Sequence, residues 1–282
     1  MVFNFGFELP EFAAFPYLET DEGLQFFDAY YQGFADIAKA ASAALALVTP
    51  TWRANADWGA RIGYDAAGLD RINRAAVALL NAKRHSLSDL DQIVVCGAIG
   101  PRGDGYAVGE IPYIDEAERY HRAQIESFAA AGADSVEAMT ITNANEAAGI
   151  VQAANRVGIP VGISFTVEVD GRLPDGSTLQ DAVTRVDQVG EVAYFGINCA
   201  YPDHILPGLT EGIWLARIAS LRPNASSKSH AELDESDELD AGNVDDLARG
   251  VQQIRAALPN VSIVGGCCGT NHEHVARLWN IA

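Results

Sequence analysis

Short apolar segments rich in β-branched residues alternate along this chain with longer amphipathic segments, and this alternation limits the possible folds more than any other feature. The candidate strands are LALVT (45–49), QIVVCGAI (92–99), DSVEAM (134–139), PVGISFTV (160–167), AYFGINC (193–199) and VSIVGG (261–266). Between them, apolar residues recur at intervals of three and four, which predicts helices at 65–84, 115–133, 144–158 and 243–258. Repeated strand–helix–strand units predict a parallel α/β fold.

The number of these units favours a (β/α)8 TIM barrel with a parallel sheet. A weaker strand is predicted at 218–224, and VFNFGF (2–7) is interpreted as the remnant of a shortened or diverged first strand. A barrel of this kind typically takes about 250 residues, and the chain has 282. Because no Pro/Ser-rich linker or break in composition interrupts it, we expect a single barrel domain over residues 1–282.

The charge of the chain excludes some classes of partner. Its 38 acidic and 19 basic residues give a net charge of −19, which disfavours binding to nucleic acid or to anionic lipid. No apolar run approaches the roughly 18 residues of a membrane span, and the N-terminal residues do not have the pattern of a signal peptide. We therefore expect a cytoplasmic protein. The acidic segment 230–246 is predicted to be a solvated loop leading into a helix. The sequence does not indicate the oligomeric state, and a homo-oligomer is compatible with it.

The four cysteines are Cys96, Cys199, Cys267 and Cys268. Three of them end predicted strands, and active sites in parallel barrels lie at the C-terminal ends of the strands. Cys96 falls in the middle of a predicted strand and is expected to be a core residue. The sequence therefore predicts that Cys199, Cys267 and Cys268 lie at the end of the barrel where chemistry takes place.

The adjacent pair Cys267–Cys268 allows three interpretations. A disulfide between neighbours is strained, because their Cα atoms are about 3.8 Å apart whereas an unstrained bridge needs ~4.4–6.8 Å. Simple packing would place the two side chains on opposite faces of a strand. Shared ligation of one metal requires the backbone to leave strand geometry, and the neighbouring glycines 265, 266 and 269 supply that freedom. The glycines favour the metal interpretation without excluding the other two.

Two adjacent thiolates and a third from Cys199 would form a soft three-sulfur site, for which Zn²⁺ is the natural occupant. Three protein ligands leave a fourth position open, which is typical of a catalytic zinc site. Such a site suits the activation of a substrate thiol: a free thiol with a pKa near 8.5 is only a few per cent ionised at pH 7, so full ionisation on zinc raises the thiolate population roughly 30-fold. The thiolate can then attack an electrophilic carbon.

At these residues the chain resembles the homocysteine S-methyltransferase family, a group of zinc-dependent barrel enzymes. GINC, ending in Cys199, and GGCCGT, containing Cys267 and Cys268, are similar to the two zinc-ligand motifs of that family. The resemblance extends over CGAIGPRGDGY (96–106), VEAMTITNANEA (136–147) and SFTVEVDGRLPDGSTL (164–179), and covers the chain from about residue 44 to its end.

The resemblance implies that Cys199, Cys267 and Cys268 bind zinc, that the homocysteine thiolate is the fourth ligand and that Glu137 binds the amino group of homocysteine. It further implies transfer of a methyl group to homocysteine, as in methionine biosynthesis. The implied partners are therefore a small-molecule thiol acceptor and a methyl donor. Because no cobalamin- or folate-binding module follows the barrel, we expect a small donor such as S-methylmethionine, S-adenosylmethionine or a betaine.

Two departures from the family pattern keep other functions in view. The chain has no Asp-Gly-Gly segment in a first strand, and the region after Pro223–Asn224 differs from that usual in the family. A non-catalytic or repurposed barrel that binds zinc and an amino acid is therefore one alternative. A zinc hydrolase is another, and it would need histidine or carboxylate ligands and a general base near the metal.

Further substrate-binding candidates follow from their places in the chain. Asn198 precedes a predicted zinc ligand, and Thr51 and Trp52 follow a predicted strand at the active end of the barrel, where Trp52 could wall the pocket. Glu137 could instead be a buried carboxylate with structural partners. His272 and His274 are expected to begin the last helix, with surface or capping roles.

Overall fold

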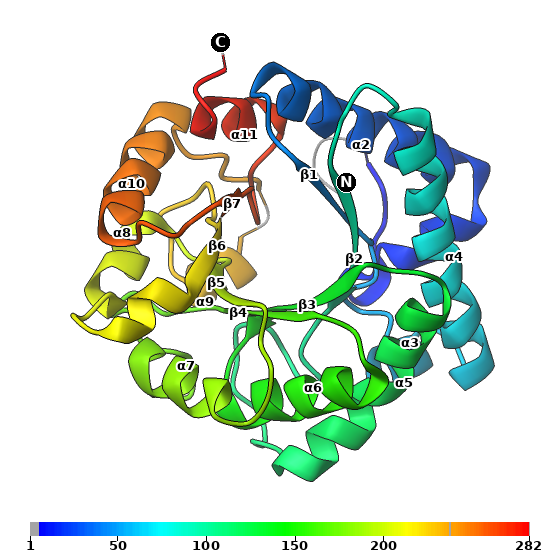
Figure 1. The fold of residues 1–282 in the computed structure, drawn as a ribbon, viewed down its shortest axis with the longest axis horizontal. Coiled ribbons are helices and arrows are strands. Elements are labelled where there is room, and N and C mark those ends of the chain that lie inside the picture. Colours follow the sequence, from blue (N-terminus) through cyan, green and yellow to red (C-terminus); the bar gives the residue numbers. More distant parts are fainter. Residues whose placement is uncertain (1–5, 237, 282) are drawn as a thin grey trace.

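The structure, a computed structural model, describes residues 6–236 and 238–281. Within these residues, seven parallel strands form one sheet in the order of the chain, and they lie at the centre of the molecule with helices around them (Figure 1). The strands are Leu45–Val48 (β1), Ile93–Ile99 (β2), Ser135–Ile141 (β3), Val161–Phe165 (β4), Tyr194–Asn198 (β5), Ile218–Arg222 (β6) and Ile263–Val264 (β7). Each coincides with a predicted strand, including the weak one at 218–224, which is β6.

Helices connect the strands and form the outer layer (Figure 1). The α-helices are Asp21–Ala40 (α2), Ala56–Arg61 (α3), Ala66–Ser86 (α4), Ile114–Ala130 (α5), Ala144–Val157 (α6), Leu179–Asp187 (α7), Pro202–Ile205 (α8), His230–Asp234 (α9), Val244–Ala257 (α10) and His272–Leu278 (α11). Short 3-10 helices lie at Pro10–Phe12 (η1), Phe15–Glu19 (η2), Leu206–Gly208 (η3) and Ile213–Arg217 (η4). The four predicted helices correspond to α4, α5, α6 and α10.

Local sequence explains where these helices begin and end. Asn143 precedes α6, and its side-chain oxygen accepts a hydrogen bond from the backbone N–H of Glu146, which satisfies one of the free donors of the first turn. Gly158 ends the same helix with a φ of 82°, a conformation that glycine adopts without strain. His272 begins α11, as expected, after the capping residue Asn271. The acidic segment 230–246 is not wholly loop, since it starts with the short helix α9.

None of the helices in the described part of the chain combines the length and the apolar character needed to cross a membrane.

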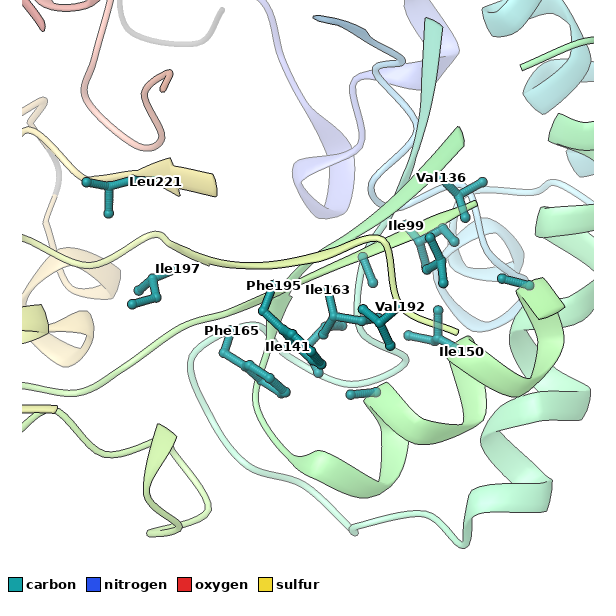
Figure 2. Close-up of a cluster of buried hydrophobic side chains, with 14 of the residues drawn as sticks. Ile99, Val136, Ile141, Ile150, Ile163, Phe165, Val192, Phe195, Ile197 and Leu221 are labelled. Carbon is teal, nitrogen blue, oxygen red and sulfur yellow. The ribbon is translucent and has the colours of Figure 1, made fainter. Parts of the chain in front are cut away.

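The hydrophobic core lies between the strands and the surrounding helices (Figure 2). Val136, Ile163, Phe195 and Leu221 are fully buried, and Ile150 of α6 is buried in the same cluster. Side chains alternate between the two faces of a strand, so the neighbours of these residues face the other way. Those inward-facing neighbours are polar or small and include Glu137, Ser164, Gly196, Asn198, Ser220 and Arg222. The interior of the sheet is therefore polar.

Over the described residues, the sheet has seven strands and not the eight of the barrel that the sequence suggested. The predicted first strand, 2–7, falls mainly outside the described residues, and between residues 6 and 44 the structure has no strand. β1 and β7 are consequently the outer strands of the sheet. The described residues confirm a parallel, curled, TIM-like sheet of seven strands, and the eighth strand stays a prediction.

Side chains from the helices occupy both open edges. Leu45 and Thr49 donate backbone hydrogen bonds toward β2. Backbone groups alternate in direction along a strand, so the carbonyl of Val48 points away from β2, to the open edge. There it accepts a hydrogen bond from the Tyr31 hydroxyl at 2.8 Å. On β7, the edge carbonyl of Val264 accepts from the Trp279 indole at 3.2 Å. Tyr31 belongs to α2, which packs against α11 across the same gap. The helical layer thus continues where the sheet is interrupted.

Candidate metal centre

Three cysteines that are distant in the sequence converge at the C-terminal ends of the strands. Cys199 follows β5 directly, whereas Cys267 and Cys268 lie beyond the end of β7. The three cysteine sulfur atoms all lie within 4.8 Å of one another, and those of Cys199 and Cys268 are 3.5 Å apart. The structure therefore brings together the three residues that the sequence singled out.

Backbone conformation explains how these side chains reach one another. By strand alternation Asn198 faces the interior, so a continued strand would turn Cys199 toward the helices. Instead Cys199 adopts a left-handed conformation with a φ of 58°, which redirects the chain. After β7, the chain turns at Gly269, whose φ is 77°, and the carbonyl of Cys267 accepts the backbone N–H of Thr270 at 3.2 Å. The pair has left strand geometry, as the metal interpretation required.

The size of the cluster fits a thiophilic metal ion. Three sulfurs at ~2.3 Å from a tetrahedral zinc would lie ~3.8 Å from one another, and the separations found here are of that order. The fourth cysteine, Cys96, is buried in β2 and does not belong to the group. Burial, followed by the charge of Glu137, raises the pKa of Cys96 to about 12. Cys199, Cys267 and Cys268 are therefore the three residues that could hold a metal ion.

The protons of the cluster are unevenly distributed. Hydrogen bonds with the other two cysteines, and then burial, raise the pKa of Cys199 well above its usual value. The hydrogen bond with Cys199 lowers the pKa of Cys267, but the hydrogen bond with Cys268 and burial outweigh it and raise that pKa to about 12. Hydrogen bonds donated by the other two thiols lower the pKa of Cys268 well below its usual value. Without metal, a negative charge in the cluster is therefore most favourable on Cys268.

A tyrosine that the sequence reasoning missed lies against two of the sulfurs. The hydroxyl of Tyr106 is 3.2 Å from the sulfur of Cys199 and 3.3 Å from that of Cys268. Its ring stacks on the imidazole of His230, with ring centroids 4.3 Å apart and an interplanar angle of 14°. Burial, followed by the nearby cysteines, raises the pKa of Tyr106. The phenol therefore keeps its proton and donates a hydrogen bond to the sulfur cluster.

The loop that carries Tyr106 is held by a compact turn. The side chain of Asp104 accepts the backbone N–H groups of Tyr106 at 2.7 Å and of Ala107 at 3.1 Å. Arg53 donates to the carbonyl of Gly103 at 3.1 Å. Its guanidinium is buried against the indoles of two tryptophans, and this burial lowers the pKa of Arg53 to about 10. A polar aromatic residue in a glycine-rich loop after β2 was the available sequence signal for Tyr106.

His230 supports the centre from the other side. One ring nitrogen, Nε2, lies 2.7 Å from the backbone carbonyl of Cys199, and the other, Nδ1, lies 2.9 Å from a carboxylate oxygen of Glu168. Both neighbours accept hydrogen bonds, so neither ring nitrogen is free to act as a general base toward a bound ligand. His230 instead fixes the peptide carbonyl of Cys199 and the ring of Tyr106.

The predicted substrate-binding residues occupy different surroundings. Asn198 lies next to the cluster, and its amide nitrogen is 3.8 Å from the sulfur of Cys267. Trp52 donates to the carbonyl of Met139 at 3.0 Å, and its ring lies under the Tyr106 loop at Gly105.

The other two candidates make their hydrogen bonds away from the sulfurs. Thr51 is fully buried and donates to the carbonyl of Ala98 at 2.9 Å. Glu137, also fully buried, accepts from Ser164 at 2.7 Å and pairs with Arg222 at 2.8 Å. Their contact with substrate stays a prediction.

Comparison with known proteins gives a consistent result. A family model described as homocysteine S-methyltransferase matches residues 29–281. A homocysteine S-methyltransferase of Escherichia coli strain K12 is 24% identical over 233 residues, which cover 77% of this chain and 74% of the relative. A homocysteine S-methyltransferase of Bacillus subtilis strain 168 is 24% identical over 255 residues, 82% of this chain and 77% of the relative.

Solved structures show the same fold. The crystal structure of the homocysteine methyltransferase MmuM from Escherichia coli, in its metallated form, superposes with a TM-score of 0.76 at 22% identity and covers 98% of this chain and 90% of that chain. The oxidised form of the same protein superposes with a TM-score of 0.75.

Proposed function

Because the chain belongs to the homocysteine S-methyltransferase family and is a thiol methyltransferase, we propose that its activity depends on zinc. The proposed reaction moves a methyl group from a small donor to homocysteine and gives methionine. The observation that carries the proposal is the group of three cysteine sulfurs within 4.8 Å of one another. These sulfurs come from the two segments whose sequences resemble the zinc-ligand motifs of the family. A structural relative solved in a metallated form supports the same assignment.

The roles of the residues follow from the chemistry of thiol methylation. Zinc, when bound by Cys199, Cys267 and Cys268, would supply a Lewis acid that favours the thiolate form of an incoming thiol. The acceptor sulfur forms a bond to the methyl carbon while the bond from that carbon to the donor heteroatom breaks and its electron pair leaves with the donor. The thiol proton passes to solvent. Tyr106 donates a hydrogen bond where several thiolates gather, which offsets part of their negative charge.

The surroundings of the cysteines argue against hydrolysis. A zinc hydrolase needs a general base beside the metal-bound water. His230 is the histidine packed against Tyr106 and the Cys199 carbonyl, and both of its ring nitrogens already face acceptors. Tyr106 keeps its proton. This arrangement supports transfer to a thiol, which becomes its own nucleophile once ionised.

The test combines metal analysis with product formation. The purified protein is expected to contain about one zinc per chain and to form methionine from homocysteine with at least one of S-methylmethionine, S-adenosylmethionine and betaine. Cys267→Ser should lose both the zinc and the activity. Cys96→Ser is the matched control and should retain both, because Cys96 is buried in β2 away from the cluster.

Each other outcome points elsewhere. Zinc without methionine from any donor would favour the non-catalytic binder. Loss of zinc in Cys96→Ser, or full zinc retention in Cys267→Ser, would show that the ligand assignment is wrong.

A further inference from the structure

A buried pair of opposite charges lies in the polar interior of the sheet, below the cysteine cluster. Glu137 on β3 is fully buried, and one of its carboxylate oxygens lies 2.8 Å from the Nη2 atom of Arg222 at the end of β6. Its other oxygen accepts from Ser164 at 2.7 Å and from Ser220 at 3.4 Å. Burying two charges is costly even when they pair, so such a pair is weak evidence for stability and better evidence for a function.

Glu137 and Arg222 differ in whether all of their polar side-chain atoms have hydrogen-bond partners. Both oxygens of Glu137 have protein partners. The Nε atom of Arg222, in contrast, is buried without a hydrogen-bond partner in the described part of the chain, and the Arg222 side chain keeps 15% of its surface exposed. A buried donor without an acceptor is rare in folded proteins. The unmet group is thus a guanidinium N–H, and Glu137 holds that guanidinium in place.

Arg222 lies between the two segments that carry the cysteines. Its backbone carbonyl accepts the N–H of Cys199 at 3.0 Å, and the carbonyl of the following residue, Pro223, accepts the N–H of Cys267 at 2.9 Å. The aliphatic part of the Arg222 side chain runs beside Gly265, which offers no side chain of its own to fill the adjoining space. Cys267 is also among the groups whose charge acts on the Arg222 guanidinium and raises its pKa, so the guanidinium lies near the sulfur cluster.

We propose that Arg222 binds the carboxylate of the thiol acceptor, with Glu137 as the residue that positions it. A guanidinium presents planar N–H donors that match a carboxylate, and the free Nε–H supplies a donor that no protein group uses. The inference rests on the proposed function and deepens it, because it names the group by which the acceptor is recognised. It also gives Glu137 a role other than direct contact with the amino group of homocysteine.

The experiment measures equilibrium binding of three thiols to the protein as purified, by calorimetry. Homocysteine has both charged groups, 4-sulfanylbutanoate lacks the amino group and 3-aminopropane-1-thiol lacks the carboxylate. Removing Arg222 alone would leave Glu137 buried without its partner, so the test variant is the double substitution Glu137→Gln, Arg222→Gln, which keeps the net charge. Arg217→Gln, which removes an arginine before β6 paired with Asp187, is the matched control.

The unaltered protein should bind both carboxylate thiols about 10- to 100-fold more tightly than 3-aminopropane-1-thiol, the worth of one or two charge-assisted hydrogen bonds. The double variant should lose that preference while its affinity for 3-aminopropane-1-thiol stays the same, and Arg217→Gln should behave like the unaltered protein. No preference for carboxylate thiols, a preference that persists in the double variant, or an equal loss for all three thiols would overturn the inference. Methionine formation without this preference would refute the role of Arg222 alone, whereas the preference without methyl transfer would refute the proposed function alone.

Discussion

Replacing Tyr106 by phenylalanine removes one hydroxyl from the sulfur cluster and tests whether that group tunes the reactive cysteine. The hydroxyl lies 3.3 Å from the sulfur of Cys268 and 3.2 Å from that of Cys199. It is among the groups that lower the pKa of Cys268, after the hydrogen bonds from Cys199 and Cys267. Without it, the Cys268 thiolate loses a donor, so its pKa should rise.

The size of the effect follows from the geometry. A hydrogen bond to a charged group contributes about 1.5–3 kcal/mol. The lower end applies here, because Tyr106 shares its proton between two sulfurs and Cys268 is exposed to solvent, which weakens electrostatic interactions. One pKa unit corresponds to about 1.4 kcal/mol, so the pKa of Cys268 in the metal-free protein should rise by about one unit.

The assay follows alkylation of the metal-free protein by iodoacetamide as a function of pH, with the modified cysteine identified by peptide mass. Thiolate is the reactive form, so in Tyr106→Phe the midpoint for Cys268 should move to higher pH, and below both midpoints its alkylation should slow about tenfold. Tyr113→Phe is the control, since Tyr113 belongs to the same loop but is 74% exposed. An unchanged midpoint in Tyr106→Phe, or an equal shift in Tyr113→Phe, would refute the reasoning.

Three further predictions concern the metal, the open edge and the cysteine turn. The pKa values of Cys199 and Cys267 are raised and that of Cys268 is lowered, so zinc loading of the metal-free protein at pH 8 should release about two protons per chain. Calorimetry in buffers of different ionisation enthalpy measures the number of protons released. A release of none or of three would contradict the prediction. Tyr31→Phe removes the donor to the edge carbonyl of β1 and should lower the free energy of unfolding by about 1 kcal/mol, with an unchanged dependence on urea; an unchanged urea midpoint would show that the edge needs no such donor. Gly269→Ala places a side chain at a φ of 77° and should destabilise the protein by about 1–2 kcal/mol in the same urea titration. Gly103→Ala is the control and should change the free energy of unfolding little, because a Cβ atom at Gly103 meets open space. Equal effects of the two substitutions would count against backbone strain at the turn.

The sequence by itself determined the order of the elements and the three cysteines that form the candidate metal centre. Apolar periodicity is a local property, so the segments at 92–99 and 144–158 could be assigned to a strand and a helix without knowledge of their neighbours. Parallel strands place their C-terminal ends on one edge of a sheet, so cysteines at the ends of the strands that became β5 and β7 were expected to lie together. The glycines around Cys267 indicated that the chain turns there.

Only the tertiary structure decided which side chains complete the site. The contacts of Tyr106 with the sulfurs and the pairing of Glu137 with Arg222 join residues that are 93, 162 and 85 positions apart, and no local pattern encodes such pairs. The open edge between β1 and β7 could not be predicted from the sequence either. Nothing in the sequence around Tyr31 or Trp279 indicates that each donates a hydrogen bond to a carbonyl at the edge of the sheet. Hydrogen bonds and charge pairs act over a few ångströms, so their partners are fixed when the strands and helices are positioned against one another.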